Sequence, residues 1–108
     1  MNALENFKQK AKIPASFGAE RPYVRLAGVD ASGDTGADAD VEFDGDAGCV
    51  RVTVTEWEKA ATGTARTPVM RVGFDIATGE ILGDDEDALS NLLVAIDGMR
   101  VLGDEDAA

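Results

Sequence analysis

The sequence predicts a single α+β domain: an antiparallel sheet of four to five strands, with a C-terminal amphipathic helix packed on one face and a short N-terminal helix or arm. Three observations lead to this prediction. Apolar and polar residues alternate through much of residues 23–82, which is the period of half-buried strands. Helical three-to-four spacing is confined to the two ends of the chain. The 108 residues also fit one domain of common size.

The first segment, residues 1–22, is expected to be a basic N-terminal helix and linker. Residues 2–12 carry a thin apolar stripe at helical spacing, made by Leu4, Phe7 and Ala11. Pro14 disfavours helix at the residue before it and is expected to end the helix. Residues 14–22 then form the linker, with Phe17 as a candidate anchor. A helix this short is marginal alone in water, so it needs a surface to pack on.

The acidic α+β domain is assigned to residues 23–103. Its expected strands share period-two alternation and cover residues 23–29, 40–44, 49–57, 68–76 and 81–82. Turn-forming residues at 30–39 predict a loop, and residues 58–67 predict a polar connection. One sheet face is expected to bury the apolar rows, which are Val50, Val52 and Val54, and Met70, Val72, Phe74 and Ile76. The other face is expected to be solvated or to bind a partner, and it carries Arg51, Thr53, Thr55 and Arg71.

The last predicted element is a helix over residues 85–102. Its buried stripe consists of Leu89, Leu92, Leu93, Ile96 and Met99. Asp84 or Asp85 is expected to cap its N-terminus, and Gly103 to end it. Residues 104–108 are assigned as an acidic tail.

The charge is strongly negative and unevenly placed. The formal net charge is −11, with a net of +3 over residues 1–25 and −14 over residues 26–108. An acidic body argues against direct nucleic-acid binding, because phosphate contacts need clustered lysine and arginine. Solubility and adaptation to high salt both explain such acidity, and composition does not separate them.

The chemistry-bearing residues exclude several function classes. Without histidine and with one cysteine, the chain has no Ser-His-Asp triad and no Cys/His zinc site. Phosphate-loop and nucleophile-elbow motifs are absent as well. The sequence therefore predicts a protein that is not an enzyme and needs no cofactor. Apolar runs are too short for a membrane span or a signal peptide, which predicts a cytoplasmic or virion-associated protein.

The acidic loops invite comparison with a calcium site. An EF-hand loop starting at Asp40 would place Gly45 at the required sixth position. The twelfth position is Arg51 where the motif needs glutamate, so the match fails. A calcium-dependent binding domain of another kind stays a weaker alternative.

The leading hypothesis is a non-enzymatic protein that acts through protein–protein interaction. It would be a structural or accessory subunit of a larger assembly, of the kind found in virus particles and mobile elements. The N-terminal arm could fold back on its own body, or it could bind a protein partner or a second copy of the chain. The interface candidates are aromatic and basic, as interface hot spots often are, and they are Phe7, Lys8, Lys10, Lys12, Phe17, Arg51, Trp57 and Arg71.

The alternative hypothesis is an inhibitor that imitates nucleic acid. Rows of carboxylates could occupy the basic cleft of a nuclease or defence complex, in place of the phosphate backbone. The densest run of acids supplies the mimic candidates, which are Asp84, Asp85, Glu86 and Asp87.

Overall fold

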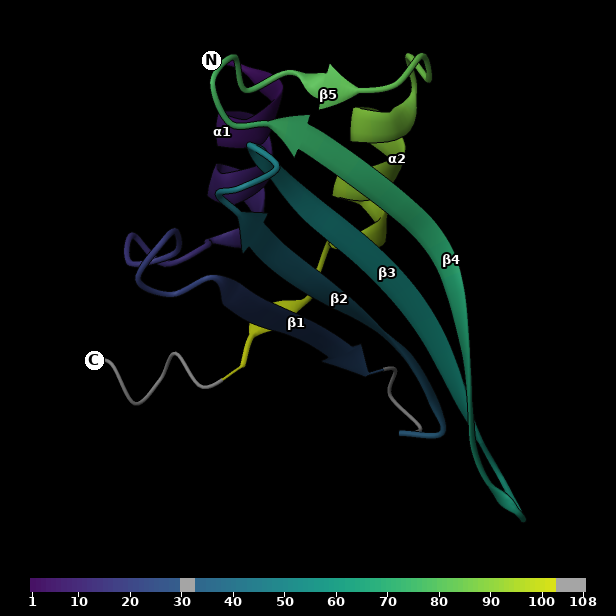
Figure 1. Ribbon diagram of the computed structural model, residues 1–108. Coiled ribbons are helices and arrows are strands. Elements are labelled where there is room, and N and C mark those ends of the chain that lie inside the picture. Colours follow the sequence, from purple (N-terminus) through teal and green to yellow (C-terminus); the bar gives the residue numbers. More distant parts are fainter. Residues whose placement is uncertain (30–32, 103–108) are drawn as a thin grey trace.

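A six-stranded antiparallel sheet forms the body of the protein in the computed structural model (Figure 1), which describes residues 1–29 and 33–102. The predicted α+β class with an antiparallel sheet is confirmed, although the sheet has one strand more than the upper expectation. The strand order is β5-β4-β3-β2-β1-β6. The elements in chain order are α1 (Ala3–Ala11), β1 (Tyr23–Val29), β2 (Thr35–Asp44), β3 (Cys49–Ala60), β4 (Gly63–Asp75), β5 (Ile81–Leu82), α2 (Ala88–Ala95) and β6 (Arg100–Val101).

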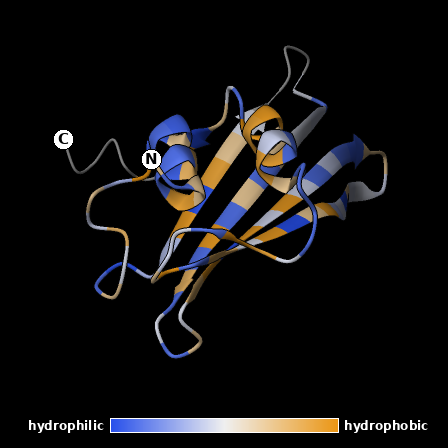
Figure 2. Ribbon diagram, turned by 90° about the horizontal axis from the view of Figure 1, so that it is seen from above, coloured by the Kyte–Doolittle hydropathy of each residue, from blue (hydrophilic) through white to orange (hydrophobic). Residues whose placement is uncertain are grey.

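Both helices lie over the same face of the sheet (Figure 2), which we call the helical face. The opposite face carries no helix formed by residues 1–29 or 33–102, and we call it the open face. Between the helices and the sheet lies one core of buried apolar side chains. The sheet contributes Val24, Leu26, Ala39, Val41, Val50, Val52, Val54, Val72 and Phe74 to it. The helices contribute Leu4, Phe7, Ala11 and Leu92, with Ile96 directly after α2.

Helix α1 matches the helix predicted over residues 2–12, and it is fixed to the sheet at several points. The Asn2 side chain caps it by accepting a hydrogen bond from the Glu5 backbone N–H at 2.8 Å. The Leu4 N–H donates to the Gly79 carbonyl at 2.8 Å. The Phe7 side chain is fully buried, and its ring stacks on Phe74 with 5.5 Å between centroids. Of the roles open to the N-terminal segment, the structure therefore shows it folded back on its own body.

Strands β2, β3 and β4 are longer than predicted. Residues 35–39 were expected in a loop, yet they pair with β3 along their whole length. Residues 58–67 were expected to form a polar connection, and they instead form the end of a long hairpin between β3 and β4. All of residues 58–67 are exposed, so neither face of this segment needs apolar side chains and the sequence shows no alternation there. Backbone pairing between β3 and β4, rather than burial, keeps the end of this hairpin extended.

The C-terminal helix is much shorter than the predicted span of residues 85–102. Helix α2 ends at Ala95, and Gly98 follows with φ of +84°, a left-handed conformation that suits glycine. Beyond it, Arg100 and Val101 form β6 on the edge of β1. The Asp-Gly dipeptide at 97–98 favours a turn. The helical spacing of Ile96 and Met99 on either side of it had instead predicted a continuous helix. Met99 consequently lies outside the helix.

The start of α2 also differs from expectation. Asp87 occupies the N-cap position, and its side chain makes no capping hydrogen bond. The Asp85 carboxylate accepts a hydrogen bond from the Asp87 N–H at 2.9 Å, in the turn before the helix. The predicted stop at Gly103 and the tail at 104–108 lie outside the described residues. Neither helix within residues 1–29 and 33–102 is long and apolar enough to cross a membrane.

Candidate functional site

The open face gathers most of the arginines of the protein. Directly opposed residues of antiparallel strands share a face, so the strand register assigns each side chain. Five of the six arginines lie on this face, namely Arg25, Arg51, Arg66, Arg71 and Arg100. The only tyrosine, Tyr23, and the only tryptophan, Trp57, lie there too. The fold therefore concentrates on one face the residue types that dominate protein interfaces.

The charges on the open face nearly balance. The open face carries six basic side chains, those of the five arginines and Lys59. It also carries five acidic side chains, which are Asp38, Asp40, Glu42, Asp44 and Asp75. The rest of the described chain carries four basic and twelve acidic residues. The acids of β2 form one row, and the arginines of β4 form a second row on the other side of β3. The open face is thus close to neutral on a protein of net charge −11.

A buried carboxylate organises one end of this face. Asp38 is only 6% exposed, although it projects from the side of the sheet without helices. It accepts hydrogen bonds from Arg25 Nη2 at 2.7 Å and from Arg66 Nη1 at 3.0 Å. The hydrogen bond with Asp38 raises the pKa of Arg25. Because Arg66 reaches Asp38 from β4 across β3, the two arginines link β1 and β4 to β2.

Trp57 packs flat against a glycine. A Cβ atom at Gly36 would lie 2.5 Å from Trp57 Cζ2 and 2.6 Å from the Gly28 carbonyl oxygen. Only glycine at position 36 leaves room for the indole ring in this position. The side chain is half-buried, so part of the ring stays accessible beside the Asp38 cluster. Trp57 therefore serves both as cover for the strand and as accessible apolar surface.

A second ion pair lies at the opposite end of the open face. Arg51 Nη2 is 2.7 Å from Asp44 Oδ2, and Arg51 Nη1 is 3.5 Å from the sulfur of buried Cys49. Two hydrogen bonds to the Asp44 carboxylate lower its pKa. The larger effect comes from the backbone N–H of Ala47, and the second largest comes from the Arg51 side chain. Between the two ends, Arg71 and Glu42 are exposed and form no ion pair with any residue that the structure describes.

Tyr23 offers a direct test of the geometry of this face. Its hydroxyl donates a hydrogen bond to the Asp40 carboxylate, and this bond, together with burial, raises its pKa above 10.0. The fold favours the neutral phenol, so the stabilisation is complete below the pKa of the unfolded chain and is lost as pH rises through the folded pKa. We expect ultraviolet absorbance to show phenolate forming at higher pH in the folded protein than in urea.

Tyr23 is the only tyrosine, so the absorbance reports one group. The variant Asp40→Asn is the matched control, because it removes the charged acceptor and should return the pKa toward its ordinary value. Equal titration curves for the folded wild type and Asp40→Asn would contradict the contact.

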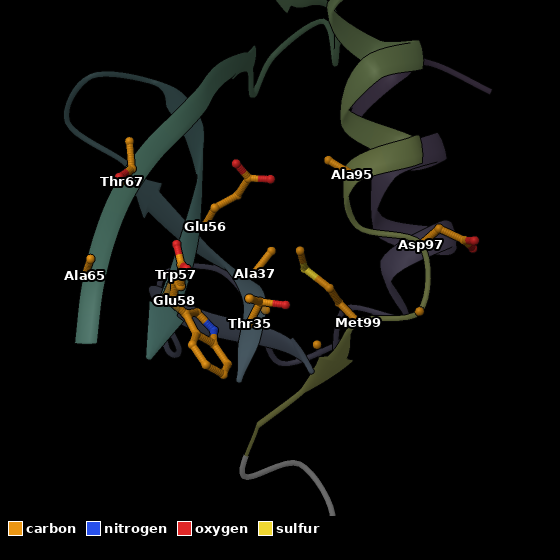
Figure 3. Close-up of a pocket in the computed structure, with 13 residues that line it drawn as sticks. Thr35, Ala37, Glu56, Trp57, Glu58, Ala65, Thr67, Ala95, Asp97 and Met99 are labelled. Carbon is orange, nitrogen blue, oxygen red and sulfur yellow. The ribbon is translucent and has the colours of Figure 1, made fainter. Parts of the chain in front are cut away.

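A groove lies on the helical face, where the sheet extends past α2 (Figure 3). Strand β3 spans about 40 Å at 3.3 Å per residue, whereas α2 spans about 12 Å at 1.5 Å per residue. The part of the sheet that α2 does not cover forms one wall of this groove, which has a volume of about 710 Å³. Glu56 and Met99 extend into it from opposite sides, while Asp97 points away (Figure 3). Three carboxylates, those of Glu56, Glu58 and Asp97, and the hydroxyl groups of Thr35 and Thr67 are among the polar groups that line the groove.

The remaining sequence-predicted residues are distributed over the molecule. Phe7 and Phe17 are buried, and Phe17 packs in a T-shaped arrangement with Phe43, with 6.1 Å between the ring centroids, so both belong to the core rather than to a surface. Lys10 pairs with Asp97 at 3.0 Å, and Lys12 is exposed. Lys8 is half-buried. The mimic candidates Asp84, Asp85, Glu86 and Asp87 are all exposed, between β5 and α2.

The structure thus unites Arg51, Trp57 and Arg71 on the open face. Sequence reasoning missed Arg25 and Arg66 as members of the same face. The alternation in β1 was a usable signal for Arg25, but Arg66 lay in a segment expected to be a connection. Residues 1–29 and 33–102 contain no cluster of three or more Cys, Asp or Glu side chains that could hold a metal ion. No protein-family model, curated protein or solved structure matches the chain.

Proposed function

We propose that this protein is a non-enzymatic interaction protein, a structural or accessory subunit of a larger assembly, and that it binds its protein partner through the open face. One observation carries the proposal: the uncovered side of the sheet holds five of six arginines and the only tyrosine and tryptophan. Interfaces are enriched in these residue types and depleted in lysine and glutamate. A solvated face without a partner has no need of this composition.

The open face supports this role better than the N-terminal arm. Helix α1 uses its apolar stripe within its own core, so it presents mainly lysines to a partner. The open face instead offers an accessible indole ring and guanidinium groups that are already oriented by Asp38 and Asp44. Side chains held in place before binding lose less conformational entropy when the partner docks.

The test compares capture of partners by three forms of the full chain. We expect proteins retained by the wild type from a lysate of its source to be lost with Arg71→Glu, which reverses an unpaired charge on the open face. The control Asn91→Ala changes an exposed residue of α2, on the side of the helices, and should retain them. Equal retention by all three forms would rule out the open face as the binding surface.

A nucleic-acid-mimicking inhibitor is the second candidate. It is favoured by the excess of twelve acidic over four basic residues on the described chain outside the open face. The exposed acids at 84–87 would then meet the basic cleft of a nuclease or defence complex. We expect the triple variant Asp84→Asn, Asp85→Asn, Asp87→Asn to lose salt-sensitive binding to that enzyme. Full inhibition by the triple variant would remove this cluster from consideration.

A further inference from the structure

We propose that Asp97 is a site of spontaneous isomerisation to isoaspartate, and that the fold protects Asp44 from the same reaction. The inference concerns a chemical modification of the chain and is independent of the partner proposed for the open face. The Asp-Gly dipeptide occurs twice in the sequence, at 44–45 and 97–98. Glycine has no Cβ atom, so its backbone nitrogen can approach the preceding side chain closely. The dipeptide alone therefore makes the two sites equivalent, and the structure distinguishes them.

The reaction joins the Gly98 nitrogen to the Asp97 side chain. The nitrogen attacks Cγ of the protonated carboxyl group and an N–Cγ bond forms. The bond from Cγ to the hydroxyl oxygen breaks, and the N–H proton leaves with that hydroxyl as water. A second water then adds to the main-chain carbonyl carbon of the resulting cyclic imide and breaks the bond from that carbon to nitrogen. The chain now continues through Cγ, the former main-chain carbonyl is a free carboxyl group, and the mass is unchanged.

Asp97 meets the requirements of this reaction. Helix α2 ends at Ala95, and Asp97 lies in the turn that follows, with a side chain that is 71% exposed. Gly98 is exposed, and its N–H donates no hydrogen bond within the described chain. The ion pair with Lys10, at 3.0 Å, joins two exposed side chains, and such pairs hold their members weakly. The carboxyl group can therefore reach the nitrogen without breaking a buried contact among residues 1–29 and 33–102.

Asp44 is held in an unreactive arrangement. One carboxylate oxygen accepts a hydrogen bond from the Ala47 N–H at 2.9 Å, and the other accepts one from Arg51 Nη2 at 2.7 Å. Both bonds must break before the side chain can turn towards the Gly45 nitrogen. The bond from Ala47, followed by that from Arg51, also lowers the pKa of Asp44. Less of the protonated acid is then present at a given pH, so Asp44 should react more slowly than Asp97.

Isomerisation at Asp97 would also act on the edge of the sheet, because it adds one carbon atom to the main chain between α2 and β6. Strand β6 pairs with β1 through Arg100 and Val101, and the Leu102 N–H donates to the Arg25 carbonyl at 2.8 Å. A longer turn shifts these groups relative to β1. We expect the Leu102 amide to exchange its hydrogen faster in the isomerised chain, separated by ion-exchange chromatography. Unchanged exchange there would contradict this effect on β6.

The main experiment follows both sites in the purified full chain during incubation at neutral pH. Trypsin places them in separate peptides, residues 26–51 and 72–100, and electron-transfer fragmentation distinguishes isoaspartate from aspartate. We expect Asp97 to isomerise at least about tenfold faster than Asp44, because a hydrogen bond to a charged group is worth about a factor of ten or more. In urea, where only the local sequence remains, the two sites should react at similar rates.

Two variants test the cause of the difference. Arg51→Ala removes one hydrogen bond from Asp44 and should speed isomerisation there, while the rate at Asp97 stays the same. Asp97→Glu keeps the charge but lengthens the side chain by one carbon, so it should abolish the reaction at position 97. Circular dichroism of each variant keeps these outcomes separate from loss of fold.

Three results would overturn the inference. Equal rates at the two sites in the folded chain would show that the fold does not distinguish them. A folded-state rate at Asp97 that falls as far below its rate in urea as that of Asp44 would show that the fold protects both. A rate at Asp44 that Arg51→Ala leaves unchanged would show that the contacts of its carboxylate are not the cause.

Discussion

Phe7→Ala is expected to lower the free energy of unfolding by about 3–5 kcal/mol, the usual cost of truncating a buried phenylalanine. The Phe7 side chain is 0% exposed and stacks on Phe74 of β4, so its loss leaves a cavity between α1 and the sheet. Domains of this size are stable by only about 5–15 kcal/mol. The variant should therefore lose a large part of the total stability, measured by urea denaturation with linear extrapolation.

The matched control is Gln9→Ala, an exposed position on the same helix. It should change stability by less than about 0.5 kcal/mol, since it touches no packed or capped feature. If Phe7→Ala cost no more than this control, α1 would not be part of the core. The N-terminal segment would then become the first candidate for an interaction arm, as the sequence alone allowed.

Gly79→Ala is expected to destabilise the protein by about 1.5–4 kcal/mol through two separate effects. Gly79 has φ of +74°, and an L-residue in the left-handed region costs about 1–2 kcal/mol. A Cβ atom there would also lie 2.1 Å from Asn2 Nδ2. Displacing Asn2 removes the N-cap of α1, which is worth about 0.5–2 kcal/mol. Urea denaturation again gives the free energy of unfolding.

A double-mutant cycle separates the two effects. In an Asn2→Ala background the cap is already absent and the clash is relieved, so Gly79→Ala should cost only the backbone strain. Gly45→Ala is the control glycine, because its φ is not positive and an added Cβ would make an ordinary contact 3.4 Å from Phe43. An equal cost for Gly79→Ala in both backgrounds would show that the turn at 75–80 does not position α1.

Several elements could be predicted because their own side chains carry the signal. β1 begins and ends at the predicted residues, since apolar side chains alternate within it. Of the predicted apolar rows, Val50, Val52, Val54, Val72 and Phe74 are buried as expected, whereas Met70 and Ile76 are only partly buried. The stripe of α1 was visible from the spacing of Leu4, Phe7 and Ala11. Locally encoded periodicity is the part of a fold that a single sequence reveals most directly.

Other elements depend on partners far along the chain. The outer half of the β3–β4 hairpin has mostly small or polar exposed side chains, and the first half of β2 consists of small and polar residues, of which Asp38 and Ala39 are buried. Pairing between these two segments keeps them extended. β6 exists because residues 100–101 meet the free edge of β1. The same distinction applies to the candidate site. Arg51 and Arg71 lie in predicted strands, so alternation places them on one face. Asp38 and Arg66 lie in segments that were expected to be a loop and a connection, so alternation could not place them.

The sequence by itself determined the fold class, the apolar rows of the core and the candidate function classes, because composition and short-range periodicity encode them. Only the tertiary structure decided that α1 is fixed to the sheet and that five arginines share one face with Tyr23 and Trp57. The physical reason is register. A shift of one residue moves every side chain of a strand to the other face, and that register is set by hydrogen bonds between strands that are distant in sequence.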